Sequence, residues 1–433
     1  MKQSHLFSCT ALALSLSLVP IAYAKPANQD PLYLSSVAEL EAALVDDNAG
    51  RRLVLQSGVY AIDVPLVVPD GVSLEGEGIM LTDGLPTGFE PGTETTIVAA
   101  NPFAGDLLTL GDGAQLRGLQ IEQPFEVAGN VVTVKSRAPG DTISASIVDC
   151  ELISDNVNGI GPDGPVGGGV LVFTRNPNPF GAPPPHDGSD LALRMDNSIV
   201  QVTPGANAVF GINFSSLSSV TISLARNRLN GTLNIVGGVS RFDQVSGSAT
   251  MIYSDRNLYE GTPIAAGMQI QGGAAPPVPV PAPGSNDNYV YVSSSNDRIE
   301  GFGWGILAAA AGRFNDTTGP SSRNTVDLRI RGLSLDSQGA GAADLSLFAA
   351  QSSGQYSPGD NNTLLVLIRD TTGSGPTDNR YGATVDDIGD PLPSNLGSGN
   401  RLELSGNQRA FDQANANIIP LPPTKFFAGG LKN

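Results

Sequence analysis

Two glutamates, Glu260 and Glu300, hold matching places in a repeated segment, and their side chains could exchange protons or bind a cation. Each lies a few residues after an asparagine and directly before a glycine. On stacked parallel strands, which lie ~4.8 Å apart, two such carboxylates could share a Ca²⁺ ion or shift each other's pKa. Asp255 and Asp297 lie nearby in the sequence, so we predict a calcium site formed by Glu260, Glu300, Asp255 and Asp297.

The same alignment, made on the asparagines of the repeats, predicts a second column of side chains on the outside of the molecule. This column contains Asp196, Arg226, Arg256, Ser295 and Arg331. Alternating acids and arginines on an exposed surface usually form a solvated ladder of ion pairs, which is the alternative to a catalytic site.

Few other reactive side chains are available. After residue 24 the sequence has one histidine, His186, in a proline-rich segment where we expect a solvated loop residue. Histidine-based triads and histidine-rich metal sites are therefore excluded. Cys150 follows an alternating strand over 146–149, and we expect its thiol to face the interior as a small apolar group.

Short strands must position these side chains. One amphipathic helix is predicted near Val37, because Ser36 and Glu39 have the spacing of a capping box. The later segments alternate polar and apolar residues with period two. A unit of strand, asparagine and glycine recurs about every 30 to 40 residues, at Asn197, Asn227, Asn257 and Asn296, with looser copies at Asn324 and Asn362. This repetition predicts a solenoid of parallel strands in which each turn, or rung, covers the next.

Insertions between the repeats collect at one turn of the rung. The segments 176–188, 272–284 and 311–322 are rich in proline, glycine and polar residues, and each lies between one apolar strand and the next alternating strand. Loops of variable length at one corner are compatible with a solenoid, because they leave the stacked strands in register.

The helix, the strand over 53–62, the segment 68–78 and the asparagine-marked repeats together resemble the right-handed parallel β-helix proteins of the pectate-lyase-like superfamily. The resemblance implies an all-β fold of about ten rungs, an N-terminal helix that caps the solenoid and a ladder of stacked asparagines. We expect residues 1–24 to be a signal peptide, 25–410 the β-helix domain and 411–433 a proline-rich tail.

The resemblance also implies a chemistry. Lyases of this superfamily combine Ca²⁺ with an arginine or lysine base, so Arg298 and Arg256 become the candidate catalytic arginines beside Glu260 and Glu300. The family's cleft lies along the strands after the glycines, here 232–236, 264–269 and 304–308, whose outward positions lack acids and arginines. Asn213, Asn234 and Gln269 could instead bind sugar hydroxyls.

Aromatic residues could also form a sugar platform. Trp304 is the only tryptophan, and we interpret it as a core anchor, with the floor of a shallow groove as the alternative. Tyr289 and Tyr291 lie on one face of a strand and are interpreted as packing residues.

Charge and targeting signals restrict the partners. The chain carries a formal charge of −18 and has no basic run, which argues against nucleic acid as a partner. Residues 1–24 combine Lys2, an apolar run and the small-residue pattern of a cleavage site. No later apolar stretch is long enough to span a bilayer. We therefore predict a monomer without a membrane span that is secreted to the periplasm or to the cell exterior.

Two functions remain open from the sequence. One is a carbohydrate-active or carbohydrate-binding protein that acts on an extracellular polysaccharide, with calcium-assisted elimination as its catalytic form. The other is a non-catalytic surface or matrix solenoid. Because the strong negative charge repels polyuronates, a neutral glycan or a calcium-dependent mode is expected.

Overall fold

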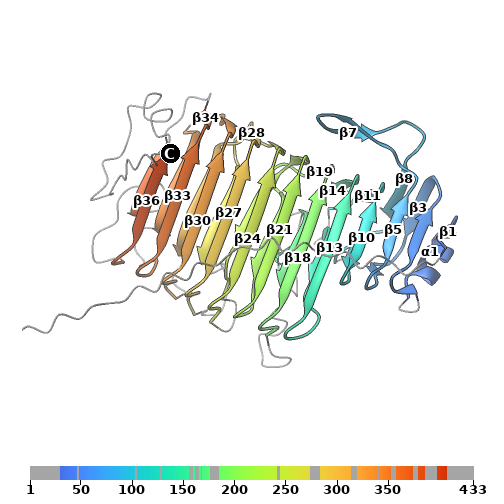
Figure 1. The fold of residues 1–433 in the computed structure, drawn as a ribbon, viewed down its shortest axis with the longest axis horizontal. Helices are drawn as coiled ribbons and strands as arrows, with labels where there is room; N and C mark the ends of the chain where they lie inside the picture. Colours follow the sequence, from blue (N-terminus) through green and yellow to red (C-terminus); the bar gives the residue numbers. More distant parts are fainter. Residues whose placement is uncertain are drawn as a thin grey trace, which may run out of the picture.

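The protein is a right-handed parallel β-helix in its computed structural model (Figure 1). The structure describes residues 30–406 except 46–47, 103–104, 127–128, 156–158, 161–164, 167, 176–184, 241–243, 274–282, 314–318, 340, 353–356, 374–378 and 386–396. Within these ranges the chain forms three long parallel sheets, which we call sheets A, B and C. This confirms the all-β solenoid predicted from the repeats and from the superfamily resemblance.

The strands of each sheet stack in the order in which they follow one another along the chain. Sheet A contains β1 (Leu32–Leu34), β2 (Arg52–Leu55), β5 (Ser73–Gly76), β10 (Ala114–Arg117), β13 (Thr142–Val148), β18 (Asp190–Asp196), β21 (Ser219–Ala225), β24 (Ala249–Asp255), β27 (Tyr289–Ser295), β30 (Thr325–Arg331), β33 (Thr363–Arg369) and β36 (Arg401–Gly406). Sheet B contains β3 (Gly58–Ile62), β8 (Thr95–Ala99), β11 (Gln120–Gln123), β14 (Glu151–Ser154), β19 (Ile199–Val202), β22 (Arg228–Asn230), β25 (Leu258–Glu260), β28 (Arg298–Glu300), β31 (Ser334–Asp336) and β34 (Thr372–Gly373). Sheet C contains β4 (Leu66–Val68), β9 (Leu108–Leu110), β12 (Asn130–Lys135), β17 (Gly168–Thr174), β20 (Asn207–Asn213), β23 (Thr232–Val236), β26 (Ala266–Gly273), β29 (Trp304–Arg313), β32 (Ala343–Ser352) and β35 (Arg380–Val385).

Each rung passes from sheet A to sheet B to sheet C and then returns to sheet A. Sheets B and C have ten strands each, which agrees with the expected number of rungs. Two antiparallel pairs lie outside the three sheets: β6 (Met80–Asp83) with β7 (Leu85–Phe89), and β15 (Gly159–Ile160) with β16 (Pro165–Val166). Figure 1 shows the β6–β7 hairpin projecting from the N-terminal third of the solenoid.

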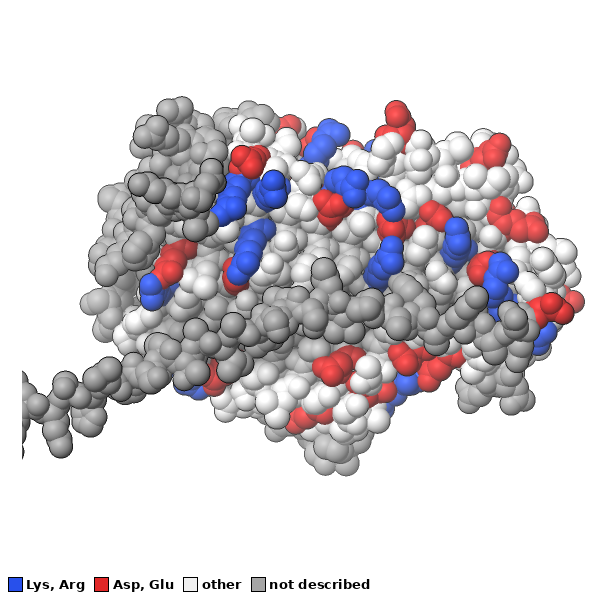
Figure 2. Space-filling view, viewed as in Figure 1, with Lys and Arg blue, Asp and Glu red and all other residues white. Residues whose placement is uncertain are grey.

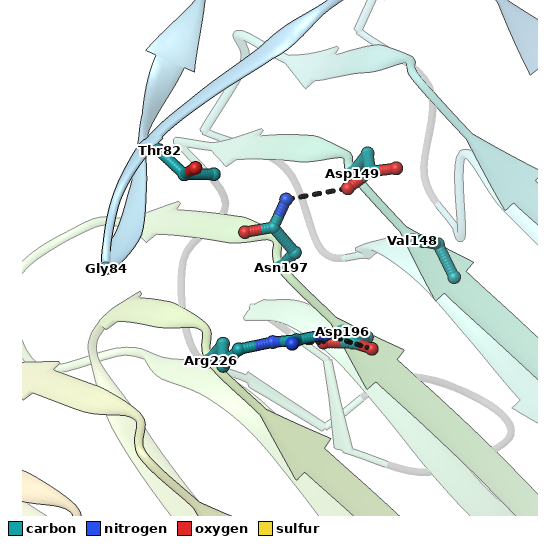
Figure 3. Close-up of a pocket in the computed structure, with 7 residues that line it drawn as sticks. All are labelled: Thr82, Gly84, Val148, Asp149, Asp196, Asn197 and Arg226. Carbon is teal, nitrogen blue, oxygen red and sulfur yellow. Dashed lines mark hydrogen bonds and ion pairs between the residues drawn. The ribbon is translucent and has the colours of Figure 1, made fainter.

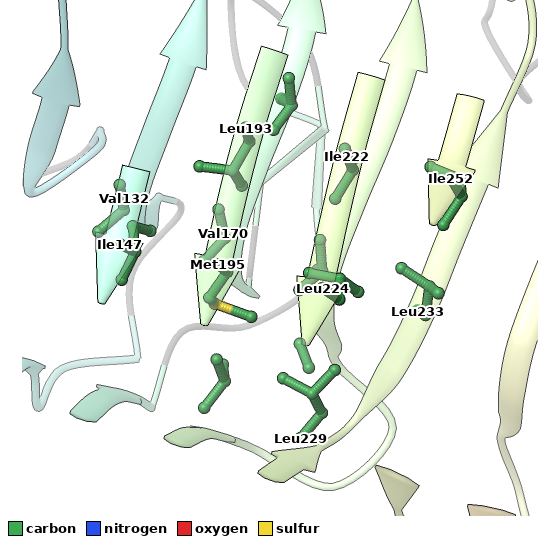
Figure 4. Close-up of a cluster of buried hydrophobic side chains, with 14 of the residues drawn as sticks. Val132, Ile147, Val170, Leu193, Met195, Ile222, Leu224, Leu229, Leu233 and Ile252 are labelled. Atoms are coloured by element: carbon green, nitrogen blue, oxygen red, sulfur yellow. The ribbon is translucent and has the colours of Figure 1, made fainter. Parts of the chain in front are cut away.

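The alternation seen in the sequence directs every second side chain into the solenoid. In β21 the residues Val220, Ile222 and Leu224 are buried, whereas the residues between them are partly exposed. Their counterparts on neighbouring strands stack directly on them, as Ile222 does on Leu193 and Ile252. Figure 4 shows this continuous column of aliphatic side chains. Each fully buried leucine or isoleucine contributes about 1.5–3 kcal/mol, so the stacked columns stabilise the rungs together.

The one α-helix among the described residues is α1 (Val37–Ala43), at the N-terminal end of the solenoid (Figure 1). The Ser36 hydroxyl accepts the backbone N–H of Glu39 at 3.3 Å, as the capping-box spacing predicts. Leu40 and Ala43 belong to the main core cluster. No helix in the described ranges is both long and apolar enough to cross a bilayer.

A ladder of buried amides connects the turns between sheets A and B. The Asn227 carbonyl oxygen accepts the backbone N–H of Ser198 at 2.9 Å, and the Asn257 oxygen accepts the backbone N–H of Asn227 at 2.8 Å. The next position is Asp297, whose carboxylate accepts the backbone N–H of Asn257 at 2.7 Å. The ladder therefore runs through Ser198, Asn227, Asn257 and Asp297.

The alignment on asparagines is one residue wrong in two repeats. Asn197 and Asn296 do not belong to this ladder, because they occupy the left-handed turn position before it, with φ values of 49° and 55°. Arg226 and Arg256 hold the same turn position in their own rungs, each with φ of 55°. In the sequence, Asn296 is one residue further from its glycine, Gly301, than Asn257 is from Gly261, and this shift explains the difference.

A second amide ladder precedes the strands of sheet A. The Asn324 oxygen accepts the backbone N–H of Asn288 at 3.0 Å, the Asn362 oxygen accepts that of Asn324 at 3.0 Å, and the Asn400 oxygen accepts that of Asn362 at 2.9 Å. Asn324 and Asn362 are therefore not copies of the turn that contains Asn227, as the sequence suggested. They satisfy backbone groups at a different corner of the rung.

The predicted signal peptide 1–24 and tail 411–433 lie outside the described residues. The same is true of most of the proline-rich segments 176–188 and 272–284.

Candidate functional site

The structure brings the two predicted glutamates together. Glu260 at the end of β25 is the register partner of Glu300 at the end of β28, and Glu300 is in turn the partner of Asp336 on β31. Asp336 was not predicted from the sequence as a site residue, because its rung has no asparagine at the aligned position. Three carboxylates therefore end three neighbouring strands of sheet B.

Arginines already neutralise two of these carboxylates. Arg228 Nε lies 2.6 Å from a Glu260 oxygen, and the Arg298 guanidinium donates two hydrogen bonds to Glu300. The pKa of Arg228 is raised by its hydrogen bond to Glu260. These residues are all at least one-third exposed, so each pair contributes at most about 1 kcal/mol.

The other two predicted calcium ligands do not join the pair. Asp297 is fully buried in the amide ladder, with its second oxygen 2.6 Å from the Ser294 hydroxyl. Burial raises the pKa of Asp297 to about 6. Asp255 lies at the end of a sheet A strand and accepts hydrogen bonds from Ser295, Arg256 and Asn296. No three acidic, histidine or cysteine side chains in the described ranges form a metal-binding group.

The predicted outward column also changes with the corrected register. Asp196 aligns with Asp255, Ser295 and Arg331, whereas Arg226 and Arg256 lie in the turns. Arg226 makes a two-pronged contact with Asp196, with Nη2 2.8 and 2.9 Å from its two oxygens. Arg256 Nε lies 2.8 Å from Asp255. Ion pairs of this kind were the alternative interpretation, but only the Arg256–Asp255 pair is open to solvent, because Asp196 is buried.

His186 and Cys150 are both buried. His186 is 3% exposed, with Nδ1 2.9 Å from the buried Ser136 hydroxyl, so its prediction as a solvated loop residue is wrong. Cys150 lies in the core as predicted, and burial raises the pKa of its thiol to about 12.

The outer face of sheet C, where the resembled family has its cleft, carries mostly apolar side chains. Leu171, Phe173, Ile212 and Val236 form a separate buried cluster there. Asn234 and Gln269 lie beside each other in register on this face and are partly exposed. The third predicted sugar ligand, Asn213, is fully buried and donates to Ala249 O and Thr250.

Trp304 is the first residue of β29, an inner strand of sheet C. Its side chain is partly exposed and belongs to none of the apolar clusters of the described residues. The interpretation of Trp304 as a core anchor is therefore wrong.

The outer face of sheet A carries a group of aromatic side chains, which we call the tyrosine face. It consists of Met251, Tyr253, Tyr289, Tyr291, Asp327 and Arg329, on the adjacent strands β24, β27 and β30. The rings of Tyr253 and Tyr291 are 5.8 Å apart and tilted by 54°. Tyr289 is 40% exposed, so its interpretation as a packing residue is wrong.

Charged groups border these rings. The Arg329 guanidinium lies 5.2 Å from the centre of the Tyr291 ring, a cation–π distance. Arg329 also forms hydrogen bonds of 3.2 and 3.0 Å to the carboxylate of Asp327. The Tyr289 hydroxyl donates to that carboxylate at 3.4 Å, and burial together with Asp327 raises the pKa of Tyr289 to about 12. The face therefore presents aromatic rings with hydrogen-bonding groups at their edge.

Figure 2 shows the solenoid in the same orientation as Figure 1, with the strands of sheet A toward the viewer. Acidic and basic side chains lie close together along this side and do not form separate acidic and basic areas. Much of the remaining surface is uncharged.

A pocket of about 370 Å³ opens between the β6–β7 hairpin and the turns that follow sheet A (Figure 3). Thr82 and Gly84 line it from the hairpin, and Asp149, Asn197 and Arg226 line it from the turns. Asn197 donates to Asp149 at 2.7 Å across one wall. The polar side chains that line this pocket therefore mostly form hydrogen bonds and ion pairs with one another.

A second pocket of about 320 Å³ lies at the N-terminal end of sheet C, lined by Val67, Thr109, Lys135, Arg137 and Asp70. Lys135 lies 3.3 Å from Asp106, and Arg137 lies 2.6 Å from Asp70 and 3.2 Å from Asp141. The basic side chains of this pocket are therefore neutralised by neighbouring carboxylates.

The sequence matches no family model and no curated protein. Among solved structures, the chain is similar to the A-module of the mannuronan C-5 epimerase AlgE6 from Azotobacter vinelandii, with 15% identity, 90% of this chain and 92% of that chain covered, and a TM-score of 0.42. It is also similar to PfbA, a surface adhesin of Streptococcus pneumoniae, with 11% identity, 81% and 87% coverage, and a TM-score of 0.36. A third similar structure is the tailspike protein of the Acinetobacter phage vB_ApiP_P1, with 10% identity, 92% and 62% coverage, and a TM-score of 0.35.

Proposed function

We propose that the protein binds an extracellular polysaccharide on the tyrosine face of sheet A. The observation that carries the proposal is the cluster of Tyr253, Tyr291 and Arg329 on the outside of a rigid sheet. Side chains that only fill the solenoid would point inward, as Val290 and Val292 do on the same strand. An outward cluster of aromatic rings needs another explanation, and ligand binding supplies one.

The chemistry of the face suits a sugar chain. The C–H faces of sugar rings pack against tyrosine rings, and their hydroxyls exchange hydrogen bonds with phenol, carboxylate and guanidinium groups. Asp327, Arg329 and the Tyr289 hydroxyl provide such groups next to the rings. Because the strands of sheet A hold the side chains at fixed spacing, little side-chain entropy is lost on binding.

Export is part of this proposal. Cleavage after Ala24 would release a mature chain that begins at Lys25, and N-terminal sequencing of the exported protein tests this expectation. An adhesive or structural solenoid would use the same face to hold a glycan without changing it.

The binding experiment compares two tyrosines of the face with a matched tyrosine elsewhere. We expect Tyr253→Ala and Tyr291→Ala each to weaken binding of the best ligand in a polysaccharide panel by at least fivefold in calorimetry, since one aromatic contact is worth about 1 kcal/mol. Tyr33→Ala is the control, because Tyr33 also lies on a sheet A strand and is 61% exposed. Equal affinities for all four proteins would contradict the proposal.

Calcium-assisted elimination is the second candidate function. Its support is the register of Glu260 with Glu300 and Asp336, near Arg298, with Arg256 in a neighbouring turn. A bound Ca²⁺ would have to replace the contacts of Arg228 and Arg298 with the two glutamates. The test is formation of unsaturated uronate ends, followed by absorbance, with Ca²⁺ and with EDTA. Activity that is lost in Glu260→Ala and Glu300→Ala would support this function, and absence of any product would remove it.

A further inference from the structure

Arg331 and Arg369 are direct register partners and the last residues of β30 and β33, two inner strands of sheet A. Both side chains are exposed. Neighbouring parallel strands lie ~4.8 Å apart, so the two guanidinium groups extend from adjacent points on the same surface. Like charges in this arrangement repel and destabilise a sheet when nothing neutralises them.

These two arginines differ from the others on this protein. Nearly every exposed arginine in the described part of the chain has a carboxylate partner, as in Arg52–Glu75, Arg226–Asp196, Arg228–Glu260, Arg298–Glu300, Arg323–Asp287 and Arg329–Asp327. Within the same described ranges, the side chains of Arg331 and Arg369 have neither an ion pair nor a hydrogen bond. An acidic protein therefore keeps two adjacent cations without an internal counter-charge.

The pair continues the tyrosine face. Arg331 lies two residues after Arg329 on β30, on the same outward side, and Arg329 contacts the Tyr291 ring. Leu365 and Leu367, partly exposed, extend the apolar part of this surface onto β33. Arg329 is paired with Asp327, so Arg331 and Arg369 are the two guanidinium groups at this end of the face that are open to a ligand.

We propose that Arg331 and Arg369 bind the anionic groups of an acidic polysaccharide whose sugar rings lie on the tyrosine face. This inference rests on the proposed function and adds the class of ligand. A planar guanidinium can hold a carboxylate or a sulfate with two parallel hydrogen bonds, and two adjacent guanidinium groups can hold one anion together or two successive ones. Carboxylated and sulfated glycans share this chemistry.

The overall charge of −18 does not prevent such binding. At physiological ionic strength, charges further than ~8 Å apart are largely screened, whereas direct guanidinium contacts are not. The net charge therefore lowers the association rate of an acidic polysaccharide, whereas direct contacts with the two arginines lower its dissociation rate. Direct binding of anionic groups by the two arginines does not need calcium. This proposal differs from the expectation drawn from the sequence, which was a neutral glycan or a calcium-dependent ligand.

The experiment uses glycans that differ only in their charge. Polygalacturonate is compared with its methyl ester, and dextran sulfate with dextran, all in the presence of EDTA at low and at physiological salt. We expect the mature wild-type protein to bind at least one charged form at least tenfold more tightly than its uncharged partner. The Arg331→Gln/Arg369→Gln variant should lose this difference and most of the salt dependence.

The charge-matched control is Arg52→Gln/Arg323→Gln, which removes two exposed arginines of sheet A and its preceding turn that already have carboxylate partners. This control should keep the preference of the wild type. The inference is overturned if the wild type does not discriminate by charge, if the Arg331/Arg369 variant still does, or if a single-stranded oligonucleotide competes better than either glycan. Equal binding of charged and uncharged forms that still depends on Tyr253 and Tyr291 would overturn the inference alone. Absence of binding to every glycan would overturn the proposed function as well.

Discussion

The carboxylate of Asp297 takes the place in its rung that the amide of Asn257 takes in the preceding one. Asn257 accepts the backbone N–H of Asn227 at 2.8 Å, and Asp297 accepts the backbone N–H of Asn257 at 2.7 Å. The two side chains also have equivalent serine partners, since Asn257 contacts Ser254 and Asp297 contacts Ser294 on the next strand. An ionisable group therefore continues a ladder of neutral amides inside the protein.

This substitution predicts a pH-dependent stability. Burial raises the pKa of Asp297 from its ordinary value of 3.8 to about 6. The neutral acid is therefore favoured in the folded state, and its contribution is complete below pH 4 and is lost as the pH rises through 6. We expect Asp297→Asn to raise the free energy of unfolding by about 2–3 kcal/mol at pH 8 and to change it little at pH 4.

Chemical denaturation at both pH values measures this effect. Asp344, whose pKa burial also raises to about 6, supplies a second contribution of the same sign, so Asp344→Asn is a useful comparison. A variant Asp297→Asn that is less stable than the wild type at pH 8 would show that the ladder needs the negative charge.

The corrected register of the ladder can be tested with two asparagines. Asn257→Ala removes the acceptor of the Asn227 N–H and the donor to Leu224 O, so we expect a loss of about 2–4 kcal/mol. Asn296→Gly should change stability little, because Asn296 occupies a left-handed turn with φ of 55° that glycine adopts readily. Similar losses for the two variants would favour the alignment on Asn296 instead.

The glycine that follows Glu260 has a packing role. A Cβ atom on Gly261 would lie against the ring of Phe302, which is 1% exposed in the core. We expect Gly261→Ala to lower the melting temperature through about 1–3 kcal/mol of overpacking. Combining it with Phe302→Leu should recover part of the loss in a double-mutant cycle. Independent, additive effects would show that the two residues do not meet.

The single core cysteine should be chemically inert in the folded protein. Burial raises the pKa of Cys150 to about 12, so almost no thiolate exists at neutral pH. We expect no labelling of the native mature protein by a disulfide reagent at pH 8 and complete labelling in denaturant. Rapid labelling without denaturant would mean that the rung around Cys150 opens easily.

The sequence by itself determined the class of fold. Polar and apolar residues alternate along segments such as 219–225, and strand geometry turns this period directly into an inner and an outer face. The recurring turns indicated the solenoid, and the place of Cys150 directly after the alternating strand over 146–149 indicated its burial. These features are local, so they could be derived from neighbouring residues along the chain.

The tertiary structure decided which residues meet across rungs. Ladder positions can hold Ser198, Asn227, Asn257 or Asp297, because each supplies an oxygen to the equivalent backbone N–H of the preceding rung, so residue type alone misplaced the register at Asn296. Insertions of unequal length separate Arg331 from Arg369 and Tyr253 from Tyr291 in the sequence, and strand pairing brings them side by side. His186 likewise became a buried partner of Ser136 only when distant segments packed together. Contacts between rungs depend on register, which hydrogen bonds along the whole stack fix and which no single repeat specifies.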